Sequence, residues 1–337
     1  MRAGGPTWVT MADVARLAGV SDMTVSNAYK RPERVAADTR KRVFDAAREL
    51  GYVLNEVAGN LASGRSRVIV AVVPSLSSSY FHATLQGAMD VLRGHGYQVM
   101  LADSGYGPLD EQKVVEAFLG RRPDGFLLTG TGHTRRTAAM LRAAEVPVVE
   151  TWEVQGPFID MAVGYSNADA GAALTALLVR KGHRRIAYVD HPDARVKRHR
   201  QRRDGIRGAL RDAGLPDERI VALPEVMGFA GGRVGIERVL STWPDTTAVI
   251  GATDVYAAGA LFECDRRGIR VPDDLAICGF GNAEIGRETC PALTTVDLRS
   301  HEMGRRAAQA LLARFEGRTD APSVVDVGFE IVERQSA

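Results

Sequence analysis

Four side chains near the N-terminus have the types and the spacing that suit contact with DNA base edges. They are Asp22, Met23, Ser26 and Asn27, and in a helix they share one outward face. Asparagine pairs with adenine, a carboxylate accepts from the cytosine amino group, and an apolar side chain contacts the thymine methyl group. The pattern predicts a helix that lies in a major groove. An ordinary helical hairpin is the alternative.

Two short helices joined by a tight turn are needed to position these side chains. Apolar residues recur at helical spacing in the first of them, at Met11, Val14, Ala15 and Ala18. Gly19 can adopt the left-handed conformation that ends a helix, and Ser21 is a good N-cap for the next one. Val25 and Ala28 then face back toward the first helix, which leaves the polar face outward.

A third helix and a short polar segment follow. Residues 39–50 have an amphipathic pattern with apolar positions at Val43, Phe44, Ala47 and Leu50, and Gly51 occupies the C-cap position. The pattern of residues 55–66 predicts a short polar helix that has one prominent apolar residue, Leu61, and ends at Gly64.

A second concentration of reactive side chains lies at residues 193–204. Its basic residues are Arg195, Lys197, Arg198, Arg200, Arg202 and Arg203, with His199 among them. The run follows a predicted strand at residues 185–189 and leads into a helix. Backbone N–H groups and guanidinium groups at such a place hold carboxylates or phosphates. A solvated basic loop is the alternative, because most charge runs are exposed.

From residue 67 onward, apolar runs of strand length alternate with helical segments. Strands are predicted at residues 68–73, 98–102, 125–129, 146–150, 185–189, 220–223, 248–251 and 275–278. Helices are predicted at residues 81–92, 110–120, 134–144, 169–181, 199–213, 229–241 and 255–268. This alternation predicts an α/β fold with parallel sheets covered by helices on both faces. Its restart near residue 169 predicts two similar subdomains.

No arrangement of side chains suggests catalysis. The G-T-G-H segment at residues 130–133 does not complete a dinucleotide-binding motif, and the sequence has no P-loop and no G-x-S-x-G motif. The seven histidines form no H-x-x-x-H pair. Cys264, Cys278 and Cys290 lack metal-ligand spacing, so reduced core thiols are expected. We therefore expect neither an enzyme, nor a metal site, nor a bound cofactor.

Length and apolar content indicate a multidomain protein outside the membrane. The 337 residues suggest two or three domains, and the 45% hydrophobic content is enough for sizeable cores. No run of 18 apolar residues and no signal peptide is present, so a cytoplasmic protein is expected. A solute-binding protein for transport is the alternative from another class. It would need a signal peptide and has no use for residues 10–64.

Charge is divided unevenly along the chain. Residues 1–67 hold eleven Lys and Arg against seven Asp and Glu, a net +4, whereas the remainder holds 32 against 34, a net −2. The N-terminal part is therefore the one suited to the DNA phosphate backbone, and a dimer would double its charge.

Ordered motifs along nearly the whole chain resemble the lactose-repressor (LacI/GalR) family of bacterial transcription regulators. The N-terminal motifs are V-T-M-A-D-V-A-R-L-A-G-V-S (9–21), T-V-S (24–26), T-R-K-R-V (39–43), E-L-G-Y (49–52) and N-E-V-A-x-x-L-A (55–62). Downstream motifs are K-G-H-R-R-I-A (181–187), R-R-D-G-I-R-G-A-L (202–210), V-P-D-D-L-A-I-C-G-F (271–280) and P-A-L-T-T-V (291–296).

For the DNA-binding part, the resemblance implies a helix-turn-helix headpiece at residues 8–54 and a hinge helix at 55–66. Its implied DNA contacts are Thr10, Ser21, Asp22, Met23, Thr24, Ser26, Asn27, Arg34, Thr39, Arg40, Asn55, Ala58 and Leu61. Thr10, Ser26, Thr39 and Arg40 are the expected phosphate contacts. Leu61 matches the residue that wedges into the central minor-groove step, and packing between two hinge helices is the alternative. The family usually has Arg where this chain has Asn27, so its operator should differ.

For residues 67–337, the resemblance implies a periplasmic-binding-protein-like domain that binds an effector and dimerises. Its N-subdomain is expected at about 67–164 and 295–321, and its C-subdomain at about 165–294 and 322–337, with crossovers near 164, 294 and 322. The ligand would lie between the subdomains, at carboxyl ends of strands. The chain stops at Ala337 without a leucine heptad tail, so a homodimer is expected rather than a tetramer.

Candidate effector contacts combine the resemblance with position after predicted strands. They are Tyr80, Phe81, Thr131, His133, Lys197, Arg198, Arg202, Thr253, Asp254 and Asn282. In the family, the arginine three residues before the glycine of this helix, here Arg202 before Gly205, grips the effector. Phe81 has a core position as its alternative. Many relatives have an acid after G-F, where this chain has Gly281 and Asn282. The missing acid and the basic run favour an acidic ligand.

Four further motifs resemble the gluconate-operon repressor branch of the family. They are V-P-S-L (73–76), L-T-x-x-x-H-T-x-R-T (128–137), D-M-A-V-G-Y (160–165) and G-F-x-x-x-x-I-G (279–286). The resemblance implies a repressor that binds a palindromic operator as a dimer and is released by gluconate or a related sugar acid. A neutral sugar, a phosphorylated sugar or a nucleobase is the alternative effector.

Overall fold

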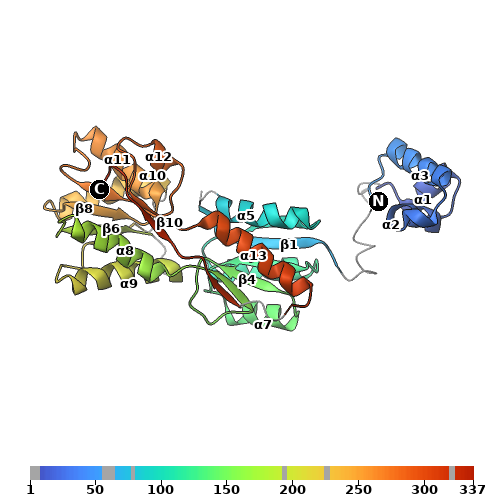
Figure 1. Cartoon of the computed structure of the whole chain (residues 1–337), viewed down its shortest axis with the longest axis horizontal. Coiled ribbons are helices and arrows are strands. Elements are labelled where there is room, and N and C mark those ends of the chain that lie inside the picture. The colour runs from blue at the N-terminus through green and yellow to red at the C-terminus, as the bar shows by residue number, and fades with distance from the viewer. Residues whose placement is uncertain (1–7, 55–64, 77–79, 192–195, 224–227, 319–322) are drawn as a thin grey trace, which may run out of the picture. The chain divides into compact units, whose positions relative to one another are not determined.

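The computed structural model describes residues 8–54, 65–76, 80–191, 196–223, 228–318 and 323–337 (Figure 1). The chain divides into two compact units, Met1–Ser66 and Arg67–Ala337, and each has its own hydrophobic core. Asn55, Ala58 and Leu61 of the predicted hinge helix lie outside the described residues. Within the described ranges, no helix combines the length and the apolarity that crossing a membrane requires.

The smaller unit is a bundle of three helices, drawn in blue in Figure 1. They are α1 (Met11–Ala18), α2 (Asp22–Lys30) and α3 (Ala37–Leu50), and the short 3-10 helix η1 (Pro32–Arg34) precedes α3. Val14, Val25 and Val43, one from each long helix, are fully buried and belong to one core cluster. The predicted helix-turn-helix is therefore confirmed.

Local hydrogen bonds fix where α1 and α2 begin. Thr10 and Asp13 form a capping box, in which the Asp13 backbone N–H donates to the Thr10 hydroxyl and the Thr10 backbone N–H donates to the Asp13 carboxylate. Gly19 has a φ of 64°, the left-handed conformation that ends α1. Ser21 then caps α2 by accepting from the Thr24 backbone N–H at 3.2 Å. The turn between the helices thus follows from local sequence alone.

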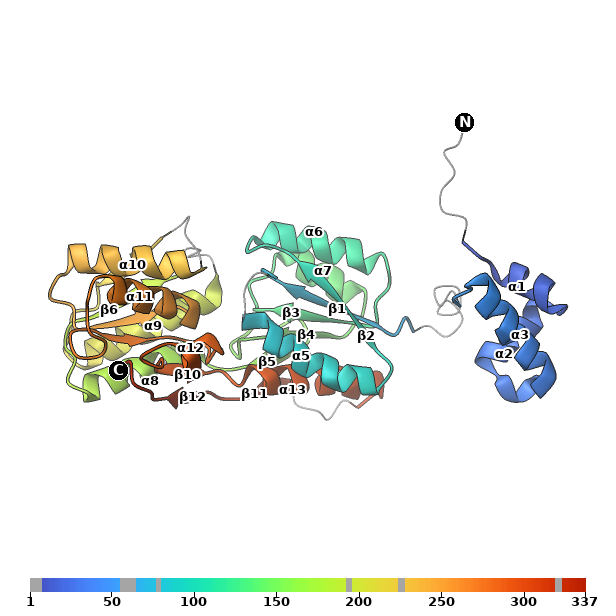
Figure 2. The ribbon, with the colours of Figure 1, turned by 90° about the horizontal axis from the view of Figure 1, so that it is seen from above.

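The larger unit contains two parallel sheets, and the first has the strand order β11-β5-β4-β3-β1-β2. These strands are β1 (Val68–Val73), β2 (Gln98–Asp103), β3 (Gly125–Thr129), β4 (Val148–Thr151), β5 (Met161–Gly164) and β11 (Val324–Asp326). Figure 2 shows α6 (Pro108–Leu119) and α7 (Arg135–Ala143) on one face, and α5 (Tyr80–Gly94) and α13 (Ser300–Phe315) on the other. We call this sheet with its four helices the first subdomain.

The side chains of β1 show how this sheet is covered on both faces. Ile69 and Val73 belong to the core cluster under α5 and α13, whereas Val70 and Val72 belong to the cluster under α6 and α7. Successive side chains of a strand point to opposite faces, so a continuous apolar run is what two buried faces require. The predicted parallel strand is confirmed.

Helices α5 and α13 pack closely although they are far apart in the sequence. Glycines make this approach possible: a Cβ at Gly87 would overlap the His301 carbonyl, and one at Gly304 would overlap the Thr84 carbonyl. The C-terminal helix is thereby held against the N-terminal part of this unit.

The second sheet has the strand order β7-β6-β8-β9. Its strands are β6 (Ile186–Asp190), β7 (Ile220–Ala222), β8 (Ala248–Gly251) and β9 (Ala276–Cys278). Figure 1 shows α8 (Asn167–Arg180) and α9 (Lys197–Asp212) on one face, and α10 (Gly228–Thr242) and α11 (Asp254–Arg266) on the other, followed by the short α12 (Ile285–Glu288). We call this sheet with its helices the second subdomain. The expected α/β class with parallel sheets is confirmed.

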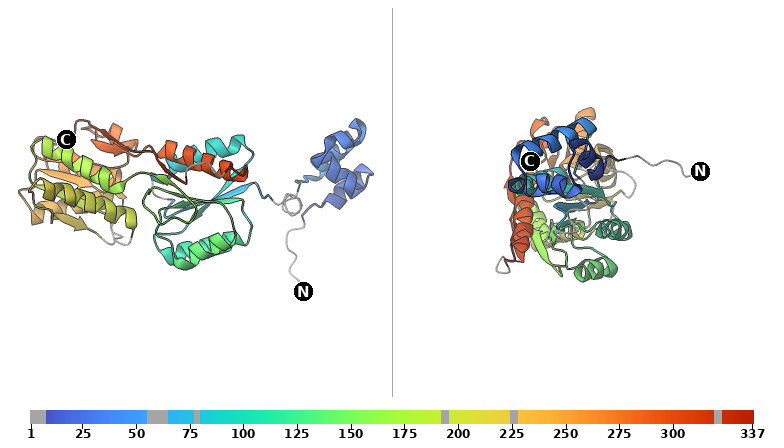
Figure 3. Two further views of the ribbon diagram at one scale, coloured as in Figure 1. Left: turned by 60° about the horizontal axis from the view of Figure 1, so that its bottom comes forward. Right: turned by 90° about the vertical axis from the view of Figure 1, so that its right-hand side faces the viewer.

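Three connections join the two subdomains. The first leads from β5 into α8, the second from β10 (Thr295–Asp297) into α13, and the third from β11 into β12 (Glu330–Val332). Strands β10 and β12 pair as an antiparallel ribbon, drawn in red in Figure 3. The third crossover was expected near residue 322, and the structure corrects this to residues 327–329. The reason is that β11 pairs with β5 and still belongs to the first sheet.

The cysteines also require a correction. Cys264 and Cys278 are buried as expected, and burial raises the pKa of the Cys264 thiol to about 11. Cys290 is exposed, so it is not a core residue. It directly precedes Pro291, in the loop that leads toward β10.

Candidate functional site

The outward face of α2 carries the predicted base-reading side chains. Asp22 and Met23 are exposed in the first turn, and the Met23 side chain is 69% exposed despite being apolar. Ser26 and Asn27 are half-buried one turn later. The buried Val25 and Ala28 lie on the opposite side of the helix, against the bundle core. An exposed methionine beside a carboxylate and an amide can contact a groove edge.

Other predicted DNA contacts surround this helix. Arg34 in η1 is exposed, and Thr39 in α3 is half-buried. The Arg40 guanidinium donates to the Pro32 carbonyl at 3.1 Å, and this contact fixes η1 against the start of α3. The Thr10 hydroxyl donates to the Asp13 carboxylate at 2.6 Å, so it also serves the α1 cap.

A cavity of about 660 Å³ lies in the larger unit, between the first and second subdomains. A volume of this size is typical of small-molecule sites. Its first-subdomain lining includes Ser75, Phe81, His82, Tyr106 and Trp152. Its second-subdomain lining includes His191, Arg198, His199, Arg202, Thr253, Tyr256, Phe280 and Glu284. Most of these residues follow the carboxyl ends of parallel strands, where open α/β sheets place ligands.

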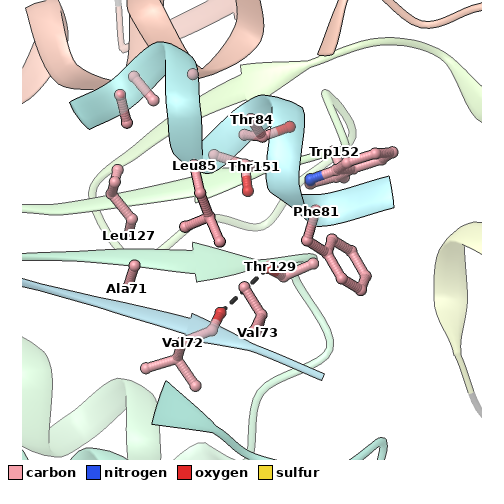
Figure 4. Close-up of a pocket in the computed structure, with 13 residues that line it drawn as sticks. Ala71, Val72, Val73, Phe81, Thr84, Leu85, Leu127, Thr129, Thr151 and Trp152 are labelled. Atoms are coloured by element: carbon pink, nitrogen blue, oxygen red, sulfur yellow. Dashed lines mark hydrogen bonds between the residues drawn. The ribbon is translucent and has the colours of Figure 1, made fainter. Parts of the chain in front are cut away.

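Aromatic rings form the wall of the cavity in the first subdomain. Phe81 and Trp152 meet edge to face with ring centroids 5.4 Å apart, and Figure 4 shows Phe81 beside the strand ends that carry Val73 and Thr129, with Trp152 next to it near α5. Trp152 is 3% exposed and has a φ of 76°, which directs the chain sharply after β4. A separate apolar cavity under α5 holds only about 20 Å³, too little for a sugar, so the large cavity is the candidate site. Figure 4 also shows the Thr129 hydroxyl donating to the Val72 carbonyl at 3.1 Å, which joins the two strands.

Arg202 on α9 reaches the opposite wall and is held there from several sides. Its guanidinium donates to the Ala252 carbonyl at 2.6 Å and to the Asn167 side-chain oxygen at 3.1 Å. It also lies over the Phe280 ring, 3.5 Å from the centroid, and its Nε is buried without a hydrogen-bond partner among the described residues. Gly205 allows this placement, because a Cβ there would overlap the Ala168 carbonyl of α8.

Arg198 lies one helical turn earlier and is 6% exposed. Its guanidinium stands over the Phe81 ring at 5.7 Å and forms no hydrogen bond with any residue that the structure describes. Burial lowers the pKa of this guanidinium, because removal from solvent destabilises the charge and outweighs the opposing effect of nearby groups such as Tyr106 and Glu153. A buried cation of this kind has donors available for an anionic ligand.

Two stacked histidines stand beside the arginines. The His191 and His199 rings are 4.1 Å apart and nearly parallel, and within the part of the chain that the structure describes the buried His199 Nδ1 has no hydrogen-bond partner. Burial, and then the charges of His191, Arg198 and Arg202, hold the pKa of His199 well below 6.5. The imidazole is therefore neutral at physiological pH and suited to a hydroxyl group.

Of the predicted effector contacts, four line the cavity: Phe81, Arg198, Arg202 and Thr253. The side chain of Tyr80 lies outside the described residues. Thr253 also caps α11, because its hydroxyl accepts from the Tyr256 backbone N–H at 3.1 Å. The other five, Thr131, His133, Lys197, Asp254 and Asn282, are not part of the cavity lining.

His133 is a buried cation inside the first subdomain. Its Nδ1 lies 2.6 Å from the Glu111 carboxylate and its Nε2 lies 3.2 Å from the Glu150 carboxylate. Desolvation alone would lower the pKa of the ring, but the two carboxylates outweigh it and raise the pKa to about 10. The trio ties the loop after β3 to α6 and β4.

Asp254 and Asn282 join loops behind the cavity wall. The Asp254 carboxylate accepts from the Thr295 hydroxyl and from the Ala283 backbone N–H. Burial raises the pKa of Asp254 to about 6. The Asn282 side chain donates to Asp297 at 3.0 Å and accepts from Arg334 at 2.7 Å. These contacts hold the loop after β9 onto the crossover strands.

Several lining residues did not emerge from the sequence: Tyr106, Trp152, His191, His199, Phe280 and Glu284. His191 and Trp152 directly follow strands, and Phe280 comes two residues after the end of β9. Position just after a strand is the signal that would have found these three. His199 lies within the basic run but did not stand out among its charged neighbours.

Comparisons with known families match both units. Residues 10–55 match the family described as bacterial regulatory proteins, lacI family. Residues 175–337 match the periplasmic binding protein-like domain.

Individual proteins extend the match to nearly the whole chain. The HTH-type transcriptional regulator GntR of Escherichia coli (strain K12) is 37% identical over 322 residues, which covers 95% of this chain and 96% of the relative. The crystal structure of a LacI family transcriptional regulator from Silicibacter pomeroyi has a TM-score of 0.91 and 32% identity, over 97% of this chain and 99% of that one. The lac repressor dimer bound to operator has a TM-score of 0.83 and 25% identity, over 98% and 99%.

Proposed function

Because the chain belongs to the LacI family of bacterial regulatory proteins, we propose that it represses transcription by binding a palindromic operator as a homodimer in the cytoplasm. A sugar acid such as gluconate releases it. The observation that carries the effector proposal is the pair of buried guanidinium groups, Arg198 and Arg202, in the cavity wall. The similarity to GntR and the motifs of the gluconate-operon repressor branch support the same choice.

Electrostatics favour an acid over a neutral ligand in this cavity. Burying a cation without a hydrogen-bonded counterion costs several kilocalories per mole, and an incoming carboxylate offsets that cost. Arg198 has donors to offer, whereas Arg202 is positioned by its neighbours to present a fixed charge. A carboxylate between the two groups would accept charge-assisted hydrogen bonds from both.

The remaining polar groups of the wall suit hydroxyls. Thr253, His199 and Glu284 all line the cavity, and together they supply both donors and acceptors. The aromatic rings of Phe81 and Trp152 give the opposite wall the apolar surface on which C–H faces of a sugar pack. A polyhydroxylated acid therefore suits the cavity better than a simple aliphatic acid.

On the DNA side, α2 reads the operator through Asp22 and Met23 in its first turn, with Asn27 one turn later. Cytosine, a thymine methyl group and adenine are the matching base features. Thr10, Ser21, Thr24, Ser26, Arg34, Thr39 and Arg40 serve as supporting contacts, chiefly to phosphates. Asn55, Ala58 and Leu61 are proposed from the sequence as hinge contacts, with Leu61 as the minor-groove wedge.

Effector binding and operator binding are coupled through the subdomain arrangement. An acid held by Arg198 and Arg202 of the second subdomain also meets the Phe81 and Trp152 wall of the first. Ligand therefore favours one spacing of the subdomains, and the operator favours another. Coupling of this kind is typically worth about 1–3 kcal/mol, or roughly 5- to 150-fold in affinity.

The test begins with operator selection from random duplex DNA by the full-length protein. Fluorescence anisotropy on the selected duplex then measures release by gluconate, 6-phosphogluconate and glucose. Release by an acid but not by glucose supports the proposal, and a preference for 6-phosphogluconate would identify a phosphorylated sugar acid, which the same guanidinium groups would hold. Release by glucose alone, or failure to select any duplex, would contradict it.

A further inference from the structure

Lys197 was expected to contact the effector, but its position suggests another task. It is the first residue of α9, and it is not among the residues that line the large cavity. The Nζ atom donates to the Thr131 hydroxyl at 2.8 Å and to the Gln155 carbonyl at 2.7 Å. It also lies 3.4 Å from the Glu153 carboxylate.

These contacts join the two subdomains directly. Lys197 belongs to the second subdomain, whereas Thr131 follows β3 and both Glu153 and Gln155 follow β4 in the first. We call these four residues the cross-cleft bridge. One turn along α9, the Gln201 side chain adds a hydrogen bond to the Gln155 side chain at 3.1 Å. Glu153 and Lys197 of the bridge line a small cavity that shares Tyr106 and Arg198 with the lining of the effector cavity.

Glu153 is the buried carboxylate of the bridge, and its charge is the one that depends on a paired cation. Its side chain is 2% exposed, and one carboxylate oxygen accepts from the Thr131 hydroxyl at 2.7 Å. Among the residues that the structure describes, Lys197 is the one cation within 4 Å of it. A buried carboxylate that loses its ion-pair partner is strongly destabilised, so another cation becomes attractive to it.

Arg198 is the next cation available. Gly130 shows how near it is: a Cβ on this glycine would lie 3.2 Å from the Glu153 Oε1 and 3.6 Å from an Arg198 terminal nitrogen. Glu153, Lys197 and Arg198 also line one small side cavity of about 90 Å³. The carboxylate of Glu153 and an acidic ligand are therefore competitors for the Arg198 guanidinium.

We propose that Lys197 is a positioning residue, which holds the Glu153 carboxylate across the cleft and so leaves Arg198 available to the acid group of the effector. This inference rests on the proposed acidic effector. It assigns Lys197 no contact with the ligand. Without Lys197, the Glu153 carboxylate pairs with the Arg198 guanidinium and occupies the anion site. It competes strongly with the ligand, because a group of the same chain has a high effective concentration.

A double-mutant cycle on the full-length protein tests the proposal. The variants are Lys197→Met, Glu153→Gln and the double variant, and calorimetric titration gives the Kd for gluconate and 6-phosphogluconate. Lys197→Met should weaken acid binding about tenfold or more, as expected when a buried charge is left uncompensated. Glu153→Gln should bind the acid at least as well as the wild type. The double variant should return to within about threefold of the wild type, because removing the competitor makes the lysine unnecessary.

Two other patterns would overturn the proposal. If Lys197 contacts the ligand, the double variant will be as weak as Lys197→Met. If the bridge acts only by holding the subdomains together, Glu153→Gln will weaken binding as much as Lys197→Met, and the double variant will not recover. Lys113→Met is the matched control, since Lys113 pairs with Asp110 on the surface with its side chain 76% exposed.

Thermal unfolding of the same four proteins separates this proposal from the effector proposal. If the wild type binds neither acid, the proposed effector is wrong. Lys197→Met should still lower the Tm, and the double variant should recover it, because the buried carboxylate is then gone. An unchanged Tm in Lys197→Met would contradict the bridge itself.

Discussion

The two units of this chain place their functional side chains in opposite ways. On α2 the candidate base-reading residue Met23 is exposed, and local caps at Thr10 and Ser21 fix the starts of α1 and α2. In the effector cavity the corresponding residues, Arg198 and Arg202, are buried: Arg202 is held by hydrogen bonds to distant segments, and Arg198 lies over the Phe81 ring of the other subdomain. Side chains that contact DNA can stand exposed on a helix fixed by local caps. Side chains that enclose a small anion must be buried, so groups from several distant segments have to surround them.

The largest expected effect comes from the buried site. Arg198→Met should raise the Kd for the acidic effector by about a hundredfold, because charge-assisted hydrogen bonds to a carboxylate are lost. Operator affinity without effector should stay near that of the wild type, as measured by anisotropy. Arg211→Met, on the same helix with an exposed side chain near Asp217, is the control. Normal effector response in Arg198→Met would remove this residue from the site.

Core truncation should distinguish the two units by stability. Val43→Ala removes a fully buried side chain from the small bundle and should cost it about 2 kcal/mol of unfolding free energy. The larger unit should be unaffected, because its core is separate. Val72→Ala is the mirror-image control in the larger unit. Differential scanning calorimetry should show one shifted transition in each variant, and a joint shift would mean that the units unfold together.

His133 should make the unfolding free energy of the larger unit fall with rising pH, an effect that the small bundle, which has no histidine, lacks. Its folded pKa of about 10 lies above the usual 6.5, so its stabilisation is fully present below pH 6.5 and is lost as the pH rises toward 10. Within that window the unfolding free energy should fall by up to about 1.4 kcal/mol per pH unit. Urea unfolding at pH 6.5, 7.5 and 8.5 measures this slope. His133→Gln should abolish it, and equal slopes in both proteins would refute the buried imidazolium.

The smallest expected effect concerns operator preference. Met23→Ala should relax the preference at one operator position by about fivefold, the lower end of what a single base contact contributes. Binding to unrelated DNA should be unchanged, because the phosphate contacts remain. Competition assays with single-base operator variants measure this. A uniform loss on all sequences would mean that Met23 supports the helix rather than reads a base.

Local signals explain why the headpiece was predictable from the sequence. The capping residues Thr10 and Ser21 and the left-handed Gly19 act within a few residues, and the structure agrees with each of them. The helix α13 was not predicted. It starts after Arg299 in a left-handed conformation without a side-chain cap, and its close contact with α5 depends on Gly304 and Gly87 from distant segments.

The effector cavity was only partly predictable, for a related reason. The basic run at residues 193–204 marked Arg198 and Arg202, and both line the cavity. The sequence does not show which strand ends meet, so Trp152 and Phe280 were missed. Lys197 was placed with the right segment, but the contact with Glu153 depends on two loops of the other subdomain.

Trp152 is placed where its intrinsic fluorescence can report ligand binding. Of the three tryptophans, Trp8 is 81% exposed, and only Trp152 belongs to the cavity lining. Its indole is packed against Phe81 and lies within 6.4 Å of the Tyr165 ring, so its emission should be blue-shifted relative to that of Trp8. A ligand that enters the cavity changes the polarity around this one indole. Effector screening can therefore follow intrinsic fluorescence without a label.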